Sequence, residues 1–484
     1  MAAAFAGAGD TAKNIRIVSD HCPDFYDTRT MAAWAVKDAK TDTEKVLAIY
    51  DLYRSMTYHL QYPQEPDAHV GTLKLLNAYG WTLCGGQASC LITLYEDAGF
   101  KTRYRGWSSP GHTTMEVYYG NAWHYVDSFL KFVAFRPDGT IASQEEIIAD
   151  PSIAMRLEKD AKREMWWYPE QKPREGWTPA DWRKLHAMLT CQDEPEGVVE
   201  GCKNSKVVGW GGTGTRDKDG YKTDIDLRPG FSLKLRWEAD KDGWYTATGK
   251  EPGHSCGTRD IRNDPIIGPK LEPYGKGAYA DGDLVFAPDL ANPVHRAAFD
   301  RAASGAYVVT MQSPFVVAHA SIEAAGEGGV KVDVTSRLGT KKDLAAGALP
   351  DDVVRGIYSY TVTIRTNKLT GLRVTSLVQH NRSARPFLLP GKNTWKISTA
   401  ALPAKAEASI EAAFKPRYHE KPLMEKWKAG DNLYANKFTR EDAQPVVVRA
   451  VLGREPAAMA FDVASDTTDD PAYPRMVYIP YVVR

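Results

Sequence analysis

The chain has no excess of charge of either sign and no long apolar run. Lysine plus arginine and aspartate plus glutamate are both 61, so the formal net charge is zero. No basic stripe of the kind that follows a phosphate backbone is present. No stretch approaches the roughly 18 consecutive apolar residues that a membrane-spanning helix needs. We therefore expect no nucleic-acid partner and no integral membrane segment, and the sequence leaves the oligomeric state open.

Cysteine is also scarce, because six cysteines in 484 residues are too few for a disulfide scaffold. Only Cys191 and Cys202 look paired, since they enclose a short loop rich in glycine, proline and acidic residues. A disulfide there favours an exported protein, and two free buried thiols are the alternative. The start of the chain lacks a basic n-region, but Ala4-Phe5-Ala6 has the A-x-A form of a cleavage site. We expect a secreted or periplasmic protein, and a cytoplasmic location stays open.

Length and pattern predict a helical N-terminal part followed by β-rich parts. At 484 residues the chain is long enough for about three domains. Thr41 and Glu44 fit a capping box at the start of a helix. After about residue 203 short alternating runs replace the helical pattern, as in antiparallel β-sandwiches. We expect an α+β protein with three domains, namely residues 1–203 with most helices, a β-rich middle domain at 204–325 and a C-terminal β-sandwich domain at 326–484.

Cys84 is the first candidate for a reactive residue. It follows an irregular segment and precedes two glycines and a helical pattern that ends at Gly99. A cysteine at a helix N-terminus meets the positive end of the macrodipole and free backbone N–H groups, and both favour the nucleophilic thiolate. The same N–H groups can receive a developing oxyanion. A buried structural cysteine is the alternative, because free cysteine is among the most buried residue types.

A predicted β-hairpin downstream brings a histidine and an aspartate together. Gly120-Asn121 fits a two-residue turn between two alternating runs. In the register that this turn sets, His112 lies opposite Phe129 and is a diagonal neighbour of Asp127 on the same face. A carboxylate in that place orients an imidazole through one ring nitrogen and leaves the other for a thiol.

These features form one ordered pattern, which covers about residues 75–130. The pattern consists of Cys84 with its helix, the run Gly99–Tyr104, Gly111-His112 with Glu116, and Trp123 with Asp127. It resembles the transglutaminase-like superfamily, and more closely its bacterial members, which share a papain-like core with a Cys–His–Asp triad in that chain order. The resemblance implies that Cys84 is the nucleophile, His112 the general base and acid, and Asp127 the residue that orients His112.

Four further residues are candidates for contact with a substrate. Trp81 and Trp107 flank the motif segments, and Glu116 and Tyr125 share the hairpin face with His112. We expect these four side chains to line the cleft, and burial or pairing within the fold is the alternative. No group of residues has metal-ligand spacing, so no metal and no cofactor is expected.

Three functions are compatible with this pattern. The first is a peptidase- or amidase-type thiol hydrolase, or an acyltransferase, that acts on an amide through a thioester of Cys84. The second is a glycan- or glycoconjugate-processing enzyme that uses the same cleft, with β domains that bind sugar. The third is a non-catalytic binding module. The expected partners are accordingly a peptide, protein or glycan substrate.

Overall fold

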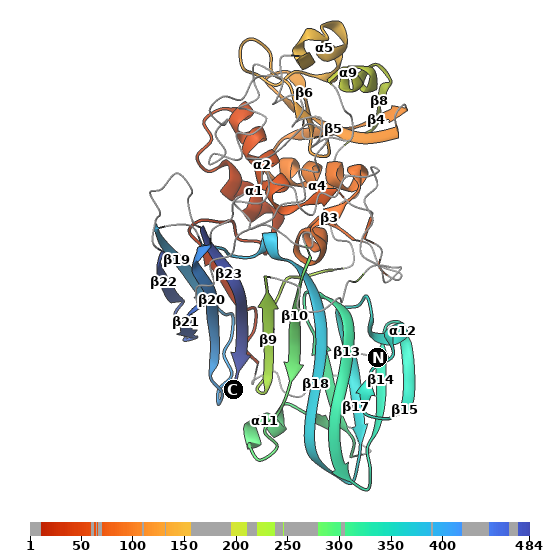
Figure 1. Cartoon of the computed structure of the whole chain (residues 1–484), viewed down its shortest axis with the longest axis vertical. Helices are drawn as coiled ribbons and strands as arrows, with labels where there is room; N and C mark the ends of the chain where they lie inside the picture. The colour runs from red at the N-terminus through yellow and green to blue at the C-terminus, as the bar shows by residue number, and fades with distance from the viewer. Residues whose placement is uncertain are drawn as a thin grey trace.

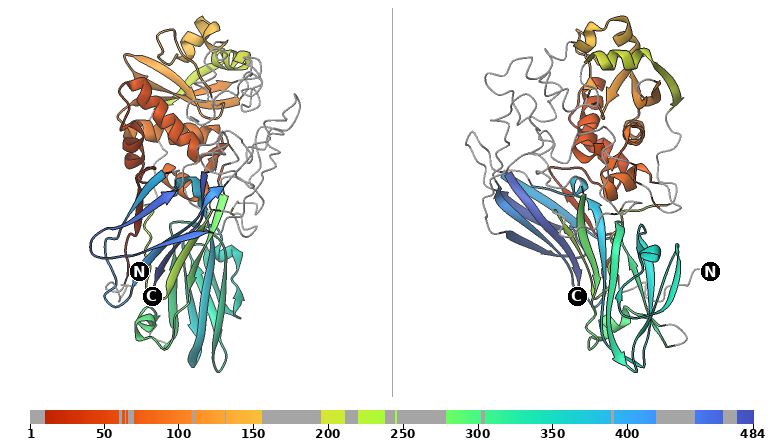
Figure 2. Two further views of the ribbon diagram at one scale, coloured as in Figure 1. Left: turned by 60° about the vertical axis from the view of Figure 1, so that its left-hand side comes forward. Right: turned by 45° about the vertical axis from the view of Figure 1, so that its right-hand side comes forward.

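The computed structural model describes most of the chain. The described residues are 11–59, 62–63, 65, 70–108, 111–130, 132–155, 195–210, 220–237, 245, 279–301, 305–388, 391–418, 445–463 and 473–484. A part with most of the helices lies at one end of a long β-rich part, and the views of Figures 1 and 2 agree on this arrangement. The α+β class predicted from the sequence is confirmed.

The helical part is built around one antiparallel sheet in the strand order β7-β6-β5-β4-β8. Its strands are β4 (Lys101–Ser108), β5 (Gly111–Tyr119), β6 (Ala122–Asp127), β7 (Phe132–Val133) and β8 (Ser205–Trp210), and a short parallel pair joins β2 (Tyr58–His59) to β3 (Trp81–Thr82). Its helices are α1 (Thr28–Val36), α2 (Asp42–Met56), α3 (Thr72–Lys74), the π-helix η1 (Leu75–Tyr79), α4 (Cys84–Asp97), α5 (Gln144–Ala149), α6 (Ser152–Met155) and α9 (Pro195–Lys203).

Helices cover both faces of this sheet. One face carries Met115 and Val117, which belong to the same buried cluster as apolar residues of α2 and α4. The other face carries Trp107 and Tyr125, which belong to a cluster with residues of α5, α6 and α9. The helix predicted after Thr41 is α2, and both hydrogen bonds of its capping box are present. Because the sheet is enclosed on both sides, polar side chains on its second face are buried and need partners.

In the β-rich part, the described residues form three antiparallel sheets. The largest has the order β16-β13-β18-β10-β9-β23-β20-β21, the second β11-β12-β17-β14-β15, and the third β1-β19-β22. The strands are β1 (Arg16–Ser19), β9 (Phe231–Arg236), β10 (Tyr279–Phe286), β11 (Asp300–Arg301), β12 (Tyr307–Gln312), β13 (Val316–Glu327), β14 (Lys331–Ser336), β15 (Gly339–Leu344), β16 (Gly347–Ala348), β17 (Ser359–Arg365), β18 (Lys368–Asn381), β19 (Gly391–Ser398), β20 (Ala408–Tyr418), β21 (Val446–Val451), β22 (Ala457–Val463) and β23 (Tyr473–Val483). Short helices α11 (Pro293–Ala297), α12 (Asp351–Val354) and η4 (Arg382–Ala384) connect them.

Strand pairing does not follow the expected domain boundaries at 203/204 and 325/326. Strand β8 lies after the first boundary, yet it pairs with β4 in the sheet of the helical part. The second boundary falls inside β13, and β9 and β10 before it pair with β23 and β18 after it. Strand β1 near the start of the chain pairs with β19. A single buried cluster accordingly contains residues from Ala12 to Val483, so the β-rich part forms around one shared core.

The two parts are joined where β18 ends beside η1. The side-chain amide of Asn381 donates to the carbonyl oxygens of Met56 (2.9 Å) and Leu76 (2.7 Å). Arg385 donates to the side-chain oxygen of Asn77 at 2.7 Å. Gly80 ends η1 at φ 76°, and a Cβ atom there would lie 2.5 Å from the side chain of Asn381, so only glycine allows this close approach. None of the helices within the described ranges is long and apolar enough to cross a membrane.

Candidate active site

Cys84 is the first residue of α4, as the sequence predicted. Leu83 is the N-cap, and its side chain accepts no hydrogen bond from the first turn. The helix therefore begins with backbone N–H groups that no capping side chain of the N-cap residue satisfies. The Cys84 side chain is partly exposed, whereas Cys22, Cys90 and Cys202 are buried.

The predicted hairpin register is confirmed. Gly120 and Asn121 form the turn with φ values of 53° and 60°, which is the left-handed geometry of a two-residue hairpin. Tyr119 pairs with Ala122, and the ladder continues with the same pairing to Met115 opposite Val126. This register brings the Nε2 atom of His112 to 2.6 Å from the Oδ2 atom of Asp127.

Asp127 is almost fully buried and has three hydrogen-bond donors. His112 and the hydroxyl of Tyr125 (2.8 Å) both bond to Oδ2. The backbone N–H of Leu130 donates to Oδ1 at 2.8 Å. Burial works to raise the pKa of Asp127, but the charge and hydrogen bond of His112, with the other two donors, lower it below its ordinary value. The carboxylate is therefore held ionised beside the imidazole.

Cys84 and His112 each shift the pKa of the other in the direction that favours a thiolate and an imidazolium. Burial opposes charge on both, yet the adjacent His112 lowers the pKa of the Cys84 thiol. Burial of His112 works to lower its pKa. The charge and hydrogen bond of Asp127, followed by the effect of Cys84, outweigh burial and raise the pKa of His112 from 6.5 to about 9. Because Asp127 occupies Nε2, the Nδ1 atom is the ring nitrogen available to the thiol. The arrangement favours a thiolate beside an imidazolium near neutral pH.

Two aromatic rings hold the imidazole of His112 in place. The ring of Trp107 meets it edge-on, with 4.9 Å between ring centroids. Phe129, which the predicted register placed opposite His112, lies with its ring centroid 5.3 Å away. Phe129 was not among the site residues predicted from the sequence, although the register that placed it opposite His112 contained the signal for it.

The four expected substrate-contact residues are all buried, since Trp81, Trp107, Glu116 and Tyr125 expose 1%, 3%, 0% and 0% of their surfaces. Tyr125 bonds to Asp127, and Trp107 packs on His112 and donates from its indole N–H to Gln144. Trp81 lies in β3 with its ring against that of Tyr79. Trp107 and Tyr125 therefore support His112 and Asp127 from within the fold, and all four side chains present almost no surface to a ligand.

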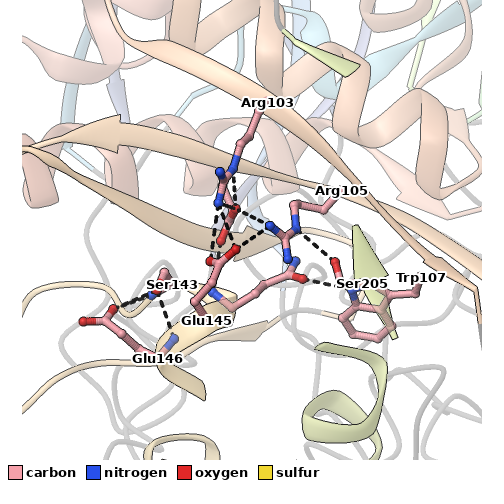
Figure 3. A network of polar contacts seen from close by, with 9 residues as sticks. Arg103, Arg105, Trp107, Ser143, Glu145, Glu146 and Ser205 are labelled. Carbon is pink, nitrogen blue, oxygen red and sulfur yellow. Dashed lines mark hydrogen bonds and ion pairs between the residues drawn. The ribbon is translucent and has the colours of Figure 1, made fainter. Parts of the chain in front are cut away.

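Glu116 belongs to a buried ion cluster on the second face of the sheet. Its carboxylate accepts a hydrogen bond from Arg103 at 2.7 Å and lies 3.6 Å from Arg105. Both arginines also bond to Glu145 of α5, and Arg105 donates to Ser205 of β8 (Figure 3). Burial, followed by the charge of Glu145, raises the pKa of Glu116. The cluster connects β4, β5, β8 and α5 across the face that also carries His112.

The disulfide considered from the sequence is not formed at Cys202, which is a free thiol. Burial raises the pKa of this thiol well above its ordinary value. Cys191, its possible partner in the sequence analysis, lies outside the described residues. Among the residues that the structure describes, no group of three or more histidine, cysteine, aspartate or glutamate side chains is arranged to hold a metal ion.

Comparison with protein families identifies a domain within the helical part. The model of the Transglutaminase-like superfamily matches residues 29–128. This range runs from α1 to the residue after β6 and contains Cys84, His112 and Asp127. Residues 29–128 are therefore a transglutaminase-like superfamily domain, as the resemblance predicted. No curated protein and no solved structure was found to match the chain.

Proposed function

We propose that the chain is a thiol-dependent amide hydrolase or acyltransferase in which Cys84, His112 and Asp127 are the catalytic residues. The observation that carries this proposal is the placement of His112, which bonds to a buried carboxylate through Nε2 and interacts with the Cys84 thiol. A transglutaminase-like domain is typically associated with this kind of cysteine chemistry.

The reaction would begin with attack of the Cys84 thiolate on an amide carbonyl carbon. The electron pair of the C=O double bond moves onto oxygen, and the positive end of the α4 macrodipole favours the negative charge that forms there. When the intermediate collapses, the C–N bond breaks and the His112 imidazolium protonates the departing amine. The acyl group stays on the sulfur of Cys84 as a thioester.

Neutral His112 then serves as a base in the second half of the reaction. It takes a proton from water, or from an acceptor amine, which attacks the thioester and releases the acyl group. Asp127 stays ionised throughout and holds the imidazole through Nε2. We propose hydrolysis rather than transfer, because no residue of the described site marks a place for an acceptor amine.

The test is capture of the acyl-enzyme. Wild type, Cys84→Ala and the control Cys90→Ala would be incubated with pooled peptide, polysaccharide and small acyl substrates, quenched in acid and weighed by intact mass spectrometry. Cys90 is a buried thiol on the same helix. We expect turnover and a hydroxylamine-sensitive adduct in wild type and Cys90→Ala and neither in Cys84→Ala. Unchanged turnover in Cys84→Ala would contradict the thiol mechanism.

A further inference from the structure

The hydroxyl of Tyr62 lies at the first turn of α4, although Tyr62 precedes Cys84 by 22 residues. The backbone N–H groups of Gly85 and Gly86 donate hydrogen bonds to it. It takes the place of the capping side chain that Leu83 lacks. A Cβ atom on residue 85 would lie only 2.4 Å from the Tyr62 oxygen, so the approach depends on a glycine directly after the nucleophile.

Tyr62 is also open to solvent and close to the nucleophile. The residue exposes 47% of its surface, in contrast to the buried tyrosines of the surrounding core. Partial burial, followed by the negative charge of Cys84, raises the pKa of Tyr62. The hydroxyl therefore keeps its proton at neutral pH and remains a hydrogen-bond donor.

On the basis of the proposed function, we propose that Tyr62 is a further catalytic residue that donates a hydrogen bond to the substrate oxygen during attack by Cys84. As the new C–S bond forms, the C=O electron pair moves onto this oxygen, and the Tyr62 O–H points a dipole at the new charge. No proton is transferred from Tyr62, and the charge returns to the C=O bond when the leaving group departs. Two amides that donate to the Tyr62 oxygen polarise its O–H bond and strengthen it as a donor.

The segment that carries Tyr62 is anchored by Glu65, three residues later. One oxygen of the buried Glu65 carboxylate accepts hydrogen bonds from Tyr79 at 2.7 Å and from Tyr358. The other accepts from Lys74 at 3.0 Å, and the exposed fractions of the Lys74 and Glu65 side chains are 2% and 0%. Tyr358 belongs to the β-rich part, just before β17. The β-rich part thus bonds to Glu65, three residues from Tyr62.

Two reagents separate an oxyanion donor from a simple helix cap. Acylation of Cys84 by p-nitrophenyl acetate passes through an oxyanion, whereas alkylation by iodoacetamide displaces iodide at a saturated carbon and does not. Both second-order rates would be measured for the full chain of wild type, Tyr62→Phe and Tyr104→Phe, with circular dichroism to verify folding. Tyr104→Phe is the matched control, because its hydroxyl lies 2.9 Å from that of Ser89, farther along α4.

For Tyr62→Phe we expect acylation to fall by about 100-fold, the usual effect of removing one oxyanion donor, while alkylation stays near the wild-type rate. Tyr104→Phe should match wild type with both reagents. An equal fall in both rates would mean that Tyr62 only caps the helix, and it would overturn the proposal. Unchanged or faster acylation in Tyr62→Phe would overturn it as well. A wild-type Cys84 that neither reagent modifies would contradict the proposed function itself, and this inference with it.

Discussion

Tyr125 donates a 2.8 Å hydrogen bond to the same carboxylate oxygen of Asp127 that bonds to His112. The two contacts lie on one face of the β5–β6 hairpin, where Tyr125 pairs with Glu116. With the Leu130 amide on the second oxygen, they hold the buried carboxylate in one orientation. We therefore propose Tyr125 as a positioning residue of the site, not a substrate contact.

Tyr125→Phe tests this role. Removing the hydroxyl leaves a buried carboxylate with one donor fewer, so we expect a loss of about 1–3 kcal/mol in the free energy of unfolding. The orientation of His112 should also loosen, which lowers kcat with little change in KM. The control is Tyr95→Phe, because that buried hydroxyl donates to the carbonyl of Val46 and does not touch the site. Urea titrations and steady-state kinetics would check both; equal kcat in the two variants would refute positioning.

The pH profile of kcat/KM should be bell-shaped. The lower limb reflects formation of the Cys84 thiolate, whose pKa is lowered chiefly by His112 against the effect of burial. The upper limb should fall near pH 9, because the imidazolium that protonates the leaving amine is lost above the raised pKa of His112. Asp127→Asn removes the charge that raises this pKa, so the upper limb should move to lower pH. Measurement of kcat/KM from pH 5 to 10 would show this shift. If the upper limb did not move in Asp127→Asn, Asp127 would not be what raises the pKa of His112.

Iodoacetamide should label Cys84 at pH 7 before any other described cysteine. Cys22, Cys90 and Cys202 are buried, and burial raises the pKa of Cys22 to about 12. Peptide mass spectrometry at short reaction times would give the order of labelling. His112→Ala should slow labelling of Cys84, because the imidazolium that stabilises the thiolate is gone. Faster labelling of a buried thiol would show that Cys84 is not activated.

Glu116→Gln should destabilise the fold without lowering the rate at which iodoacetamide labels Cys84. It removes a fully buried charge between Arg103 and Arg105, and breaking such a pair costs about 3–5 kcal/mol. Glu145→Gln is the matched control, because Glu145 bonds to the same arginines but its side chain is 54% exposed. Its loss should stay near or below about 1 kcal/mol. Thermal unfolding and iodoacetamide labelling would check this; slower labelling in Glu116→Gln alone would connect the cluster to the site.

Tyr358→Phe should slow acylation of Cys84 from a distance. The change removes the hydrogen bond from the β-rich part to Glu65 and loosens the segment that carries Tyr62. We expect p-nitrophenyl acetate acylation to fall more than iodoacetamide alkylation, as in Tyr62→Phe but to a smaller extent. Tyr360→Phe is the control, because its hydroxyl bonds to Ser376 within the β-rich core. Equal rates in both variants would mean that the Glu65 anchor does not support the site.

The elements that local patterns predicted are those whose determinants lie within a few residues of one another. The capping box of α2 depends on Thr41 and Glu44, one helical turn apart. The hairpin register depends on Gly120-Asn121 and on the alternation of side chains along each strand. For that reason the sequence predicted that His112 and Asp127, 15 residues apart, lie on the same face of the hairpin.

The sequence by itself determined a helix that begins at Cys84 and a hairpin that brings His112 and Asp127 together. Only the tertiary structure decided what surrounds them. It decided that β1 pairs with β19, that the boundary at 325/326 falls inside β13, and that Tyr358 bonds to Glu65. These pairings join residues hundreds of positions apart, and many apolar strands of similar pattern compete for each place in a sheet. No local period distinguishes them, so burial of the whole core selects the arrangement.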